Sequence, residues 1–378
     1  MDKNRIEWID ELKGFILICI CLSHMPFIKT TLLQTCVSIS TAFSVPTFFF
    51  ISGLLFNPTK YPTFTSYITN KFKSLLLPYL YLSFFFLLLS PQLYSNIQID
   101  ISIYKDEYNL LYFFNVPSLI TTWYQYLYYQ SINIIFAGNS GANTTPLWFV
   151  LALFFVSTQF YIVQKKLKGH RFLIFLFCIL CLFIGWLCSK NNIVLPWKYG
   201  VVYTASFFYS LGFLFKNYIL SQLKGNNILH YLIIIFIFFI YFYCININGA
   251  MSPFHNAFGG SLLSFVASTI TGITLVITLF KVLEQYKKNR TLNFILSVFH
   301  YIAKNAIIIL AVHFWIINCI IKYFNANISN PQYSYIFILA TLLLTYIFVP
   351  IFRNKLYFLI GKNKITFIQG FYIKSNKQ

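Results

Sequence analysis

Apolar stretches of about 15 to 21 residues alternate with short polar segments along almost the whole chain. Stretches close to 20 residues are typical of helices that cross a bilayer, whose hydrocarbon core is about 30 Å thick. The shorter ones predict tilted helices or local thinning of the bilayer. The pattern predicts an all-α, polytopic integral membrane protein with about ten transmembrane helices, at approximately 14–28, 36–56, 74–90, 146–163, 172–188, 199–215, 229–247, 260–280, 305–322 and 334–352.

The basic residues between these stretches predict the orientation. Lys and Arg are enriched in the cytoplasmic connections of membrane proteins. With the N-terminus in the cytoplasm, only five of the 28 Lys and Arg residues lie on the outer side. Both termini are therefore predicted to be cytoplasmic. The five outer residues are Lys29, Lys105, Lys190, Lys198 and Lys322.

Composition supports a multi-pass protein of the cell (inner or plasma) membrane. The chain is 58% hydrophobic and 10% charged, which is typical of integral membrane proteins. Its net charge of +20 comes from short clusters between apolar stretches, so it indicates membrane orientation rather than nucleic-acid binding. Acidic residues precede the first stretch and no small-residue cleavage site follows, so this helix is predicted to be uncleaved. With no long linker or repeat, residues 1–378 are interpreted as one domain.

One long connection interrupts the short ones, from about Pro91 to Thr145 on the outer side. It carries three of the chain's eight acidic residues and a dense aromatic run from Tyr104 to Tyr129. The part from Trp123 to Tyr129 is too polar to span the bilayer. It is predicted to form a helix that lies at the interface or folds back onto the bundle.

The first apolar stretch carries a single histidine, His24. In a helix, eleven residues bring His24 to within about 20° of Lys13 and roughly 16 Å further along the axis; Asp10 falls on nearly the same face. A titratable group this far along a membrane helix indicates a functional site. The alternative is a neutral imidazole that is satisfied by a neighbouring hydroxyl or carbonyl group. Pro26 cannot donate to the Leu22 carbonyl, which weakens the helix beside His24. A neutral imidazole is suited to general base catalysis.

Three further segments are candidates for function. Pro46 precedes the pair Ser52-Gly53, which allows another helix to approach closely. Lys71 and Lys73 lie at the inner mouth of the third stretch, either as ordinary anchors or as a site for the phosphates of a cytoplasmic donor. Trp148 begins the fourth stretch, where a tryptophan can also serve only as an interfacial residue.

A second deeply placed histidine, His313, lies nine residues beyond Lys304 and is predicted to be roughly 13 Å inside its helix. It is interpreted either as a satisfied core histidine or as a residue that positions the acceptor. His300, at an inner edge, is expected to be solvated. The Cys178–Cys181 spacing is more simply explained by core packing than by metal binding, and no metal site is predicted.

Taken in order, these segments resemble the membrane-bound acyltransferase family 3, which includes glycan O-acetylases of the fucose 4-O-acetylase type. The resemblance rests on the His24 segment, the Phe-Phe-Phe-Ile-Ser-Gly run, the basic stretch before Pro78-Tyr79 and Leu147–Phe149. Near the end, Ala303–Ile307 and Ala311–His313 are similar to the family's late Gly-Lys-Asn-Ser-Leu…His segment. The chain departs from the family pattern in carrying Lys13, Lys71, Ser74 and Ala306.

The resemblance implies an O-acyltransferase, with no bound cofactor, that uses cytoplasmic acetyl-CoA or another acyl-CoA as donor and a sugar hydroxyl as acceptor. It implies His24 as catalytic residue and Lys13 as its basic companion, and we add Asp10 to this group. Lys71 and Lys73 are assigned to the donor, and Trp148, His313 and Trp123 to the acceptor, with the aromatic segment providing faces for sugar rings. The alternatives are a polysaccharide transporter and a polysaccharide polymerase. They are disfavoured because intramembrane charge is nearly absent and no Arg lies on the outer side.

Overall fold

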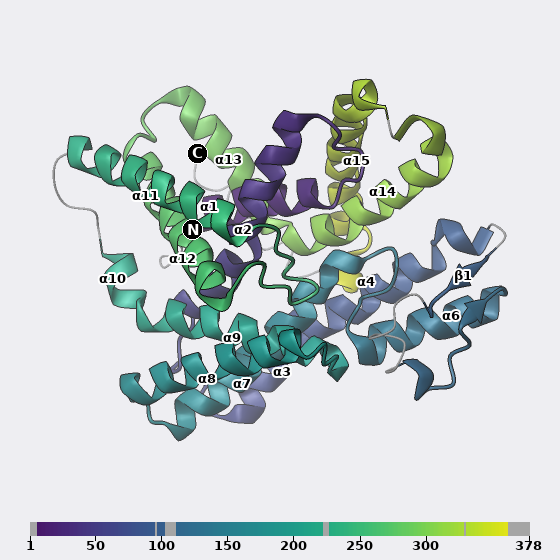
Figure 1. Cartoon of the computed structure of the whole chain (residues 1–378), viewed down its shortest axis with the longest axis horizontal. Coiled ribbons are helices and arrows are strands. Elements are labelled where there is room, and N and C mark those ends of the chain that lie inside the picture. Colours follow the sequence, from purple (N-terminus) through teal and green to yellow (C-terminus); the bar gives the residue numbers. More distant parts are fainter. Residues whose placement is uncertain (1–5, 95–96, 103–110, 222–226, 329, 362–378) are drawn as a thin grey trace. The chain divides into compact units, whose positions relative to one another are not determined.

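The computed structural model describes residues 6–94, 97–102, 111–221, 227–328 and 330–361. Almost all of the regular structure in these residues is helical (Figure 1), which confirms the all-α class. The outer Lys105, Asp106 and Glu107, and Tyr104 at the start of the aromatic run, lie outside the described residues.

Eight helical segments in the described part of the chain are long and apolar enough to cross a membrane. They correspond to eight of the ten predicted stretches. The other two stretches form α1 (Glu7–Ser23) and α9 (Tyr199–Leu214), helices of 17 and 16 residues. At about 1.5 Å per residue these two are slightly shorter than the hydrocarbon core is thick. The eight segments are Thr31–Leu54, Phe64–Leu93, Thr145–Lys166, Arg171–Lys190, Tyr231–Asn248, Leu262–Gln285, Ala306–Phe324 and Pro331–Asn354.

The helices cluster into two compact units, each built from separate stretches of chain. The single domain predicted for residues 1–378 stays a prediction. The first unit comprises the chain up to Lys60, Phe155–Val194 and Tyr199–Ala306. It contains α1 and α9 together with α2 (Thr31–Leu54), α8 (Arg171–Lys190), α10 (Lys216–Leu220), α11 (Asn227–Asn248), α12 (Leu262–Gln285) and α13 (Arg290–Lys304).

The second unit comprises Tyr61–Phe154, Leu195–Lys198 and the chain from Ile307 onward. Its α-helices are α3 (Phe64–Lys71), α4 (Leu77–Leu88), α6 (Trp123–Ile132), α14 (Ala306–Ile328) and α15 (Ser334–Asn354), and α7 (Trp148–Lys166) begins in it. Two π-helical turns (Phe72–Leu76 and Asn133–Ala137) and 3₁₀ turns at Pro91–Tyr94, Thr145–Leu147, Pro196–Lys198, Pro331–Tyr333 and Tyr357–Ile360 complete it, with strands β1 (Ile99–Asp100) and β2 (Leu119–Ile120).

Close backbone packing holds the middle of the first unit together. A Cβ atom placed on Gly53 of α2 would lie 1.8 Å from the Tyr209 carbonyl oxygen of α9. In return, a Cβ atom on Gly212 of α9 would lie 1.9 Å from the Phe50 carbonyl oxygen. The two glycines therefore allow the helix backbones to touch. This confirms the close approach predicted from Ser52-Gly53. The helix continues through Pro46, which lies inside α2.

The connection from about Pro91 to Thr145, predicted to lie on the outer side and called the outer segment below, folds back onto its own unit. Trp123–Ile132 forms α6, as predicted from the polar aromatic sequence. Tyr126 in this helix is fully buried and its hydroxyl lies 3.0 Å from the Ser90 hydroxyl beyond α4. The Tyr79 hydroxyl of α4 donates to the Ile134 carbonyl at 2.7 Å. The antiparallel pairing of β1 with β2 has no counterpart in the sequence prediction.

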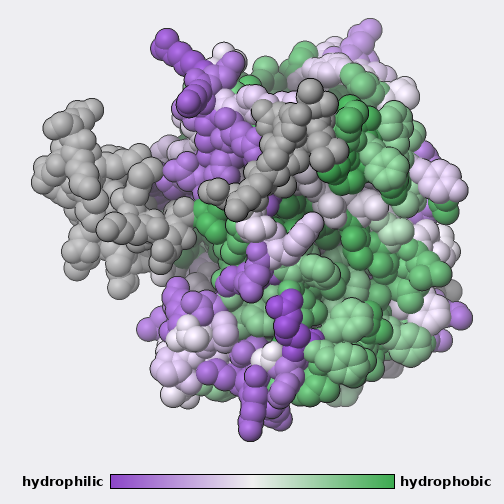
Figure 2. All heavy atoms as spheres, turned by 90° about the vertical axis from the view of Figure 1, so that its left-hand side faces the viewer, coloured by the Kyte–Doolittle hydropathy of each residue, from purple (hydrophilic) through white to green (hydrophobic). Residues whose placement is uncertain are grey.

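Apolar side chains cover much of the molecular surface. Figure 2 shows a face on which hydrophobic residues gather over a broad area beside hydrophilic groups. On α11 the exposed residues include Phe236, Phe239 and Tyr243, each exposed by more than 60%. A broad exposed apolar surface is unfavourable in water and favourable against lipid chains. The surface therefore agrees with a multi-pass membrane protein.

Candidate active site

His24 lies at the end of α1 rather than inside it. The helix ends at Ser23, and His24 is its C-terminal cap, with its backbone N–H directed to the Cys21 carbonyl at 3.3 Å. The predicted stretch of 14–28 is therefore too long at this end. Pro26 explains the difference, because it lacks an N–H and disfavours helical backbone at Met25. His24 is partly exposed and is followed by the buried Met25.

Lys13 and Asp10 lie together near the other end of α1. The Lys13 ammonium is 3.9 Å from an Asp10 carboxylate oxygen. Along the helix axis, Lys13 is about 16 Å and Asp10 about 21 Å from His24. Neither side chain can therefore touch the His24 imidazole. Lys13 and Asp10 can therefore affect the His24 imidazole only by fixing the position of α1.

Two further ion pairs, both made by Lys287, anchor the same end of α1. The Lys287 ammonium binds the carboxylates of Glu11 at 2.7 Å and Glu7 at 3.2 Å. Burial of the Lys287 ammonium opposes its charge, but hydrogen bonds to Glu11 and Glu7 outweigh this effect and raise the pKa of Lys287. Lys287 follows α12, so this cluster ties the beginning of α1 to the connection between α12 and α13.

His300, expected to be solvated at an inner edge, lies beside this cluster and is only partly exposed. Its Nδ1 lies 3.9 Å from the second carboxylate oxygen of Asp10, and its side chain is about three-quarters buried. His300 is carried by α13, a helix that the sequence analysis missed. The amphipathic spacing of Leu292, Leu296 and Phe299 was the available signal. The backbone of α13 touches α1 at Gly14, where a Cβ atom would lie 1.9 Å from the Phe299 carbonyl oxygen.

Lys71 and Lys73 flank the start of a π-helical turn in the second unit. Lys71 ends α3 and lies 5.5 Å from the centre of the Tyr67 ring, whereas Lys73 is exposed. The turn Phe72–Leu76 is closed by the Leu77 N–H, which bonds to the Phe72 carbonyl five residues earlier. Pro78 accounts for this wide turn, because it has no N–H for the Ser74 carbonyl. π-Helical turns frequently occur at functional sites.

Trp148 and His313 are both buried in the second unit. Trp148 begins α7 with 4% of its surface exposed, so it packs inside the protein rather than standing free on the surface. His313 lies in α14 with 1% exposed, and its Nδ1 is 2.6 Å from the Ile309 carbonyl. Since a carbonyl only accepts, Nδ1 carries the hydrogen and Nε2 is the basic nitrogen.

Two residues of α14 fix this helix against its neighbours in the same unit. The Trp315 indole N–H donates to the Leu89 carbonyl at 2.9 Å. The Asn318 amide donates to the Ala142 carbonyl at 2.9 Å, close to the end of the outer segment. His313 is therefore carried by a helix that is tied to the outer segment.

Trp123 stands at the exposed start of α6, in contrast to these buried groups. Its side chain is 62% exposed, and Tyr124 beside it is 58% exposed. The two rings form an edge-to-face pair with centroids 6.1 Å apart. The pair offers an aromatic surface on the outer segment.

The structure thus joins some of the predicted site residues and not others. Asp10 and Lys13 form one cluster, whereas His24 stands at the far end of their helix. The two donor lysines and the three acceptor residues belong to the second unit. Among the described residues, no group of three or more His, Cys, Asp or Glu side chains is arranged to hold a metal ion. Cys178 and Cys181 are buried as free thiols, as expected for core residues.

Comparison with known families decides the assignment. Residues 6–350 match the family described as acyltransferase domain (Acyl_transf_3). The chain belongs to membrane acyltransferase family 3. The matched range runs from before α1 into α15, so it includes every residue assigned to the site. No curated protein and no solved structure matches the acyltransferase.

Proposed function

We propose that this acyltransferase transfers an acyl group, most simply acetyl, from cytoplasmic acetyl-CoA to a hydroxyl group of a cell-envelope or exported glycan. His24 is the general base in this proposal. The family establishes an integral membrane acyltransferase. The donor, the acceptor and the base are inferred from the resemblance to glycan O-acetylases of this family and from the residues that carry it.

The observation that carries the proposal is the position of His24 at the C-terminal end of α1. The carbonyl groups at this end give the helix a partial negative charge. A base that takes a proton becomes an imidazolium ion, and a cation at a helix C-terminus is stabilised by about 0.3–1 kcal/mol, up to about 2 kcal/mol when partly buried. The helix terminus therefore offsets part of the cost of charging the His24 imidazole away from water during the reaction.

In the proposed reaction, the sugar oxygen attacks the thioester carbonyl carbon while its proton passes to the neutral imidazole of His24. A carbon–oxygen ester bond forms and the carbon–sulfur bond breaks, with the electron pair leaving on sulfur. The imidazolium then returns the proton to the CoA thiolate. Lys13 and Asp10 take no part in bond making, because they are too far along α1; they hold its inner end in place.

The proposed donor site leads to a prediction for Lys71 and Lys73. The double replacement K71A/K73A is expected to raise the KM for acyl-CoA, because two cations that attract the donor phosphates are lost. The defect should grow with ionic strength, since salt screens the remaining attraction. Donor titrations on membranes at low and high salt measure both effects.

A matched control separates phosphate binding from general anchoring. Lys165 and Lys166 form a second basic pair, at the end of α7, and Lys165 lies 5.7 Å from the Tyr161 ring much as Lys71 does from Tyr67. K165A/K166A should leave the KM for acyl-CoA unchanged. Equal effects of the two double replacements would contradict a donor site at Lys71 and Lys73.

The acceptor is assigned to the outer segment and to the residues behind it. Trp123 offers an exposed aromatic face of the kind on which sugar rings stack. Trp148 and His313 are buried, so we infer that they shape and orient the acceptor site from within.

Mass spectrometry of envelope glycans tests the proposed function as a whole. Glycans from cells that contain the protein should carry one additional acyl mass, that of acetyl, on the modified units, and glycans from cells without it should lack it. An identical glycan profile in the two strains would refute the proposal. A different mass on the same units would correct only the acyl group.

A further inference from the structure

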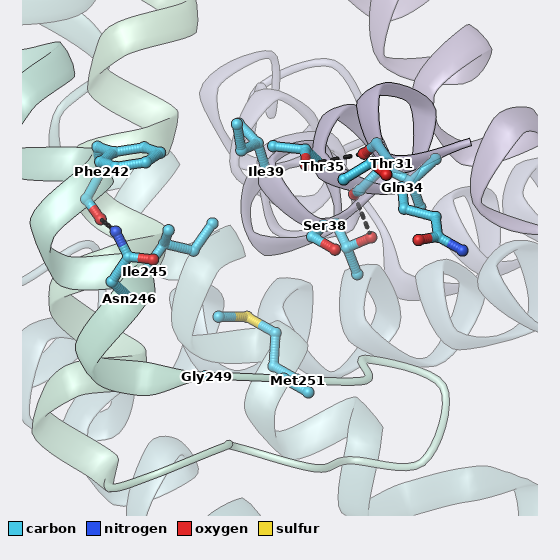
Figure 3. Close-up of a pocket in the computed structure, with 13 residues that line it drawn as sticks. Thr31, Gln34, Thr35, Ser38, Ile39, Phe242, Ile245, Asn246, Gly249 and Met251 are labelled. Carbon is cyan, nitrogen blue, oxygen red and sulfur yellow. Dashed lines mark hydrogen bonds between the residues drawn. The ribbon is translucent and has the colours of Figure 1, made fainter. Parts of the chain in front are cut away.

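A cavity of about 480 Å³ opens between α2 and α11 in the first unit. Figure 3 shows residues of the first turns of α2 facing residues near the end of α11, with Met251 lying between the two helices. The Tyr241 hydroxyl of α11 donates to the Ile39 carbonyl of α2 and joins the two helices at the cavity. Its size is within the range of small-molecule sites, about 300–1,000 Å³.

The α2 wall of the cavity carries hydroxyl groups on one face. Thr31, Thr35 and Ser38 follow each other at intervals of four and three residues, so they lie one above the other. The Thr35 hydroxyl donates to the Thr31 carbonyl at 2.9 Å, which leaves its oxygen able to accept a hydrogen bond. Gln34 and Asn246 add amide groups. The wall can therefore both accept and donate hydrogen bonds.

The remaining lining is uncharged and mostly apolar. Phe242, Ile245 and Met251 present carbon surface, and none of the 13 lining residues is acidic or basic. A phosphate or a carboxylate would find no cation here. A neutral polyol fits both parts of the lining, since it has hydroxyl groups for the polar wall and C–H faces for the apolar residues.

The cavity is connected to His24 through a short piece of chain. The Gln34 side-chain amide donates to the Ile28 carbonyl at 3.4 Å. Ile28 is four residues from His24, so their Cα atoms are at most about 14 Å apart. A glycan that reaches His24 with one sugar has the cavity within the reach of its neighbouring sugars.

We propose that this cavity binds an uncharged sugar unit of the acceptor, next to the unit whose hydroxyl reacts at His24. The proposal rests on the proposed function and adds the substrate class of a second subsite. It assigns acceptor recognition to the hydroxyl face of α2 in the first unit. The preferred acceptors are then glycans in which the sugar next to the reacting one is uncharged and carries free hydroxyl groups.

The replacements T35V and S38A test the subsite. Each removes one hydroxyl with little change of volume, and each should raise the KM for the acceptor about fivefold, the effect of one lost hydrogen bond. The KM for acyl-CoA should not change. The probe is envelope glycan freed of its acyl groups by mild base, titrated into membranes that contain each variant.

T274V is the matched control. Thr274 of α12 is exposed and donates to the Ile270 carbonyl at 2.8 Å, as Thr35 does to Thr31, but it does not line the cavity. It should leave both KM values unchanged. S38W, which fills the cavity, should prevent saturation by the glycan while the KM for acyl-CoA stays the same.

Two results overturn the subsite. One is an unchanged acceptor KM in T35V, S38A and S38W at normal protein levels, as expected if lipid fills the cavity. The other is a rise of the acceptor KM in T274V equal to the rise in T35V and S38A. These results leave the proposed function intact, because glycan acylation continues. Failure of the proposed function is distinct: wild-type protein would then acylate no glycan at any concentration.

Discussion

Replacement of His24 by alanine is expected to abolish detectable glycan acylation while the amount of membrane-inserted protein stays normal. A general base contributes about 10²–10⁴-fold to the rate. His24 follows the last residue of α1, so its replacement removes no side chain from within the helix. H24Q should be nearly as inactive, because an amide is polar but cannot take up the proton. Acylation is measured by mass spectrometry and protein abundance by immunoblotting.

Two comparisons make this test specific to the imidazole. H170A removes an exposed histidine that precedes α8 and should keep full activity. H313A should reduce activity less than H24A, through weaker acceptor binding. Wild-type activity should also fall as the pH drops through the pKa of the His24 imidazole in the free enzyme, since only the neutral ring is a base. Near-normal acylation by well-expressed H24A would exclude His24 as the base.

Replacement of Gly212 by alanine is expected to have the largest effect on stability. The new Cβ atom would lie 1.9 Å from the Phe50 carbonyl oxygen, so α9 and α2 must move apart. Overpacking of this kind costs about 1–3 kcal/mol, occasionally more. The midpoint of thermal unfolding of the purified protein should fall, and its abundance in membranes should decrease.

Gly200 provides the control in the same helix. A Cβ atom there would lie 3.3 Å from the Cys188 Cβ, a tight contact that requires only a small shift. G200A should therefore unfold close to the wild-type temperature. If G212A is as stable as G200A, the backbones of α2 and α9 are further apart than the structure places them.

The sequence was most informative where one interaction dominates. Apolar length alone located the spanning helices, because lipid leaves the backbone few alternatives to a helix. The Ser52-Gly53 pair predicted a close helix contact, because only small residues allow it. The end of α1 was placed several residues too late, because hydrophobicity continues through Met25 and Phe27 while Pro26 ends the helix.

The residues of the candidate site could be named from the sequence, but the side chains that they contact could not. Helical spacing placed Lys13 and Asp10 on one face, and their ion pair agrees with that placement. Spacing along the chain could not indicate that His300 would face Asp10 or that Lys287 would bind Glu11, because these contacts join residues 290 and 276 positions apart. The cavity beside α2 was missed for the same reason. Its second wall comes from α11, and spacing along one helix reveals only one wall.

The unbroken course of α1 between Lys13 and His24 has a mechanical consequence. Because the helix is continuous, the distance between the ion-pair cluster and His24 along its axis, and the angle between them around the axis, are both fixed. A displacement of α1 at Glu11 and Lys287 would therefore move His24 as well, by a translation or rotation of the whole helix. The seven residues from His24 to Thr30 are not helical and accommodate such a displacement before α2 begins. If His24 is the general base, as proposed, the ion pairs at the beginning of α1 determine the position of the catalytic group.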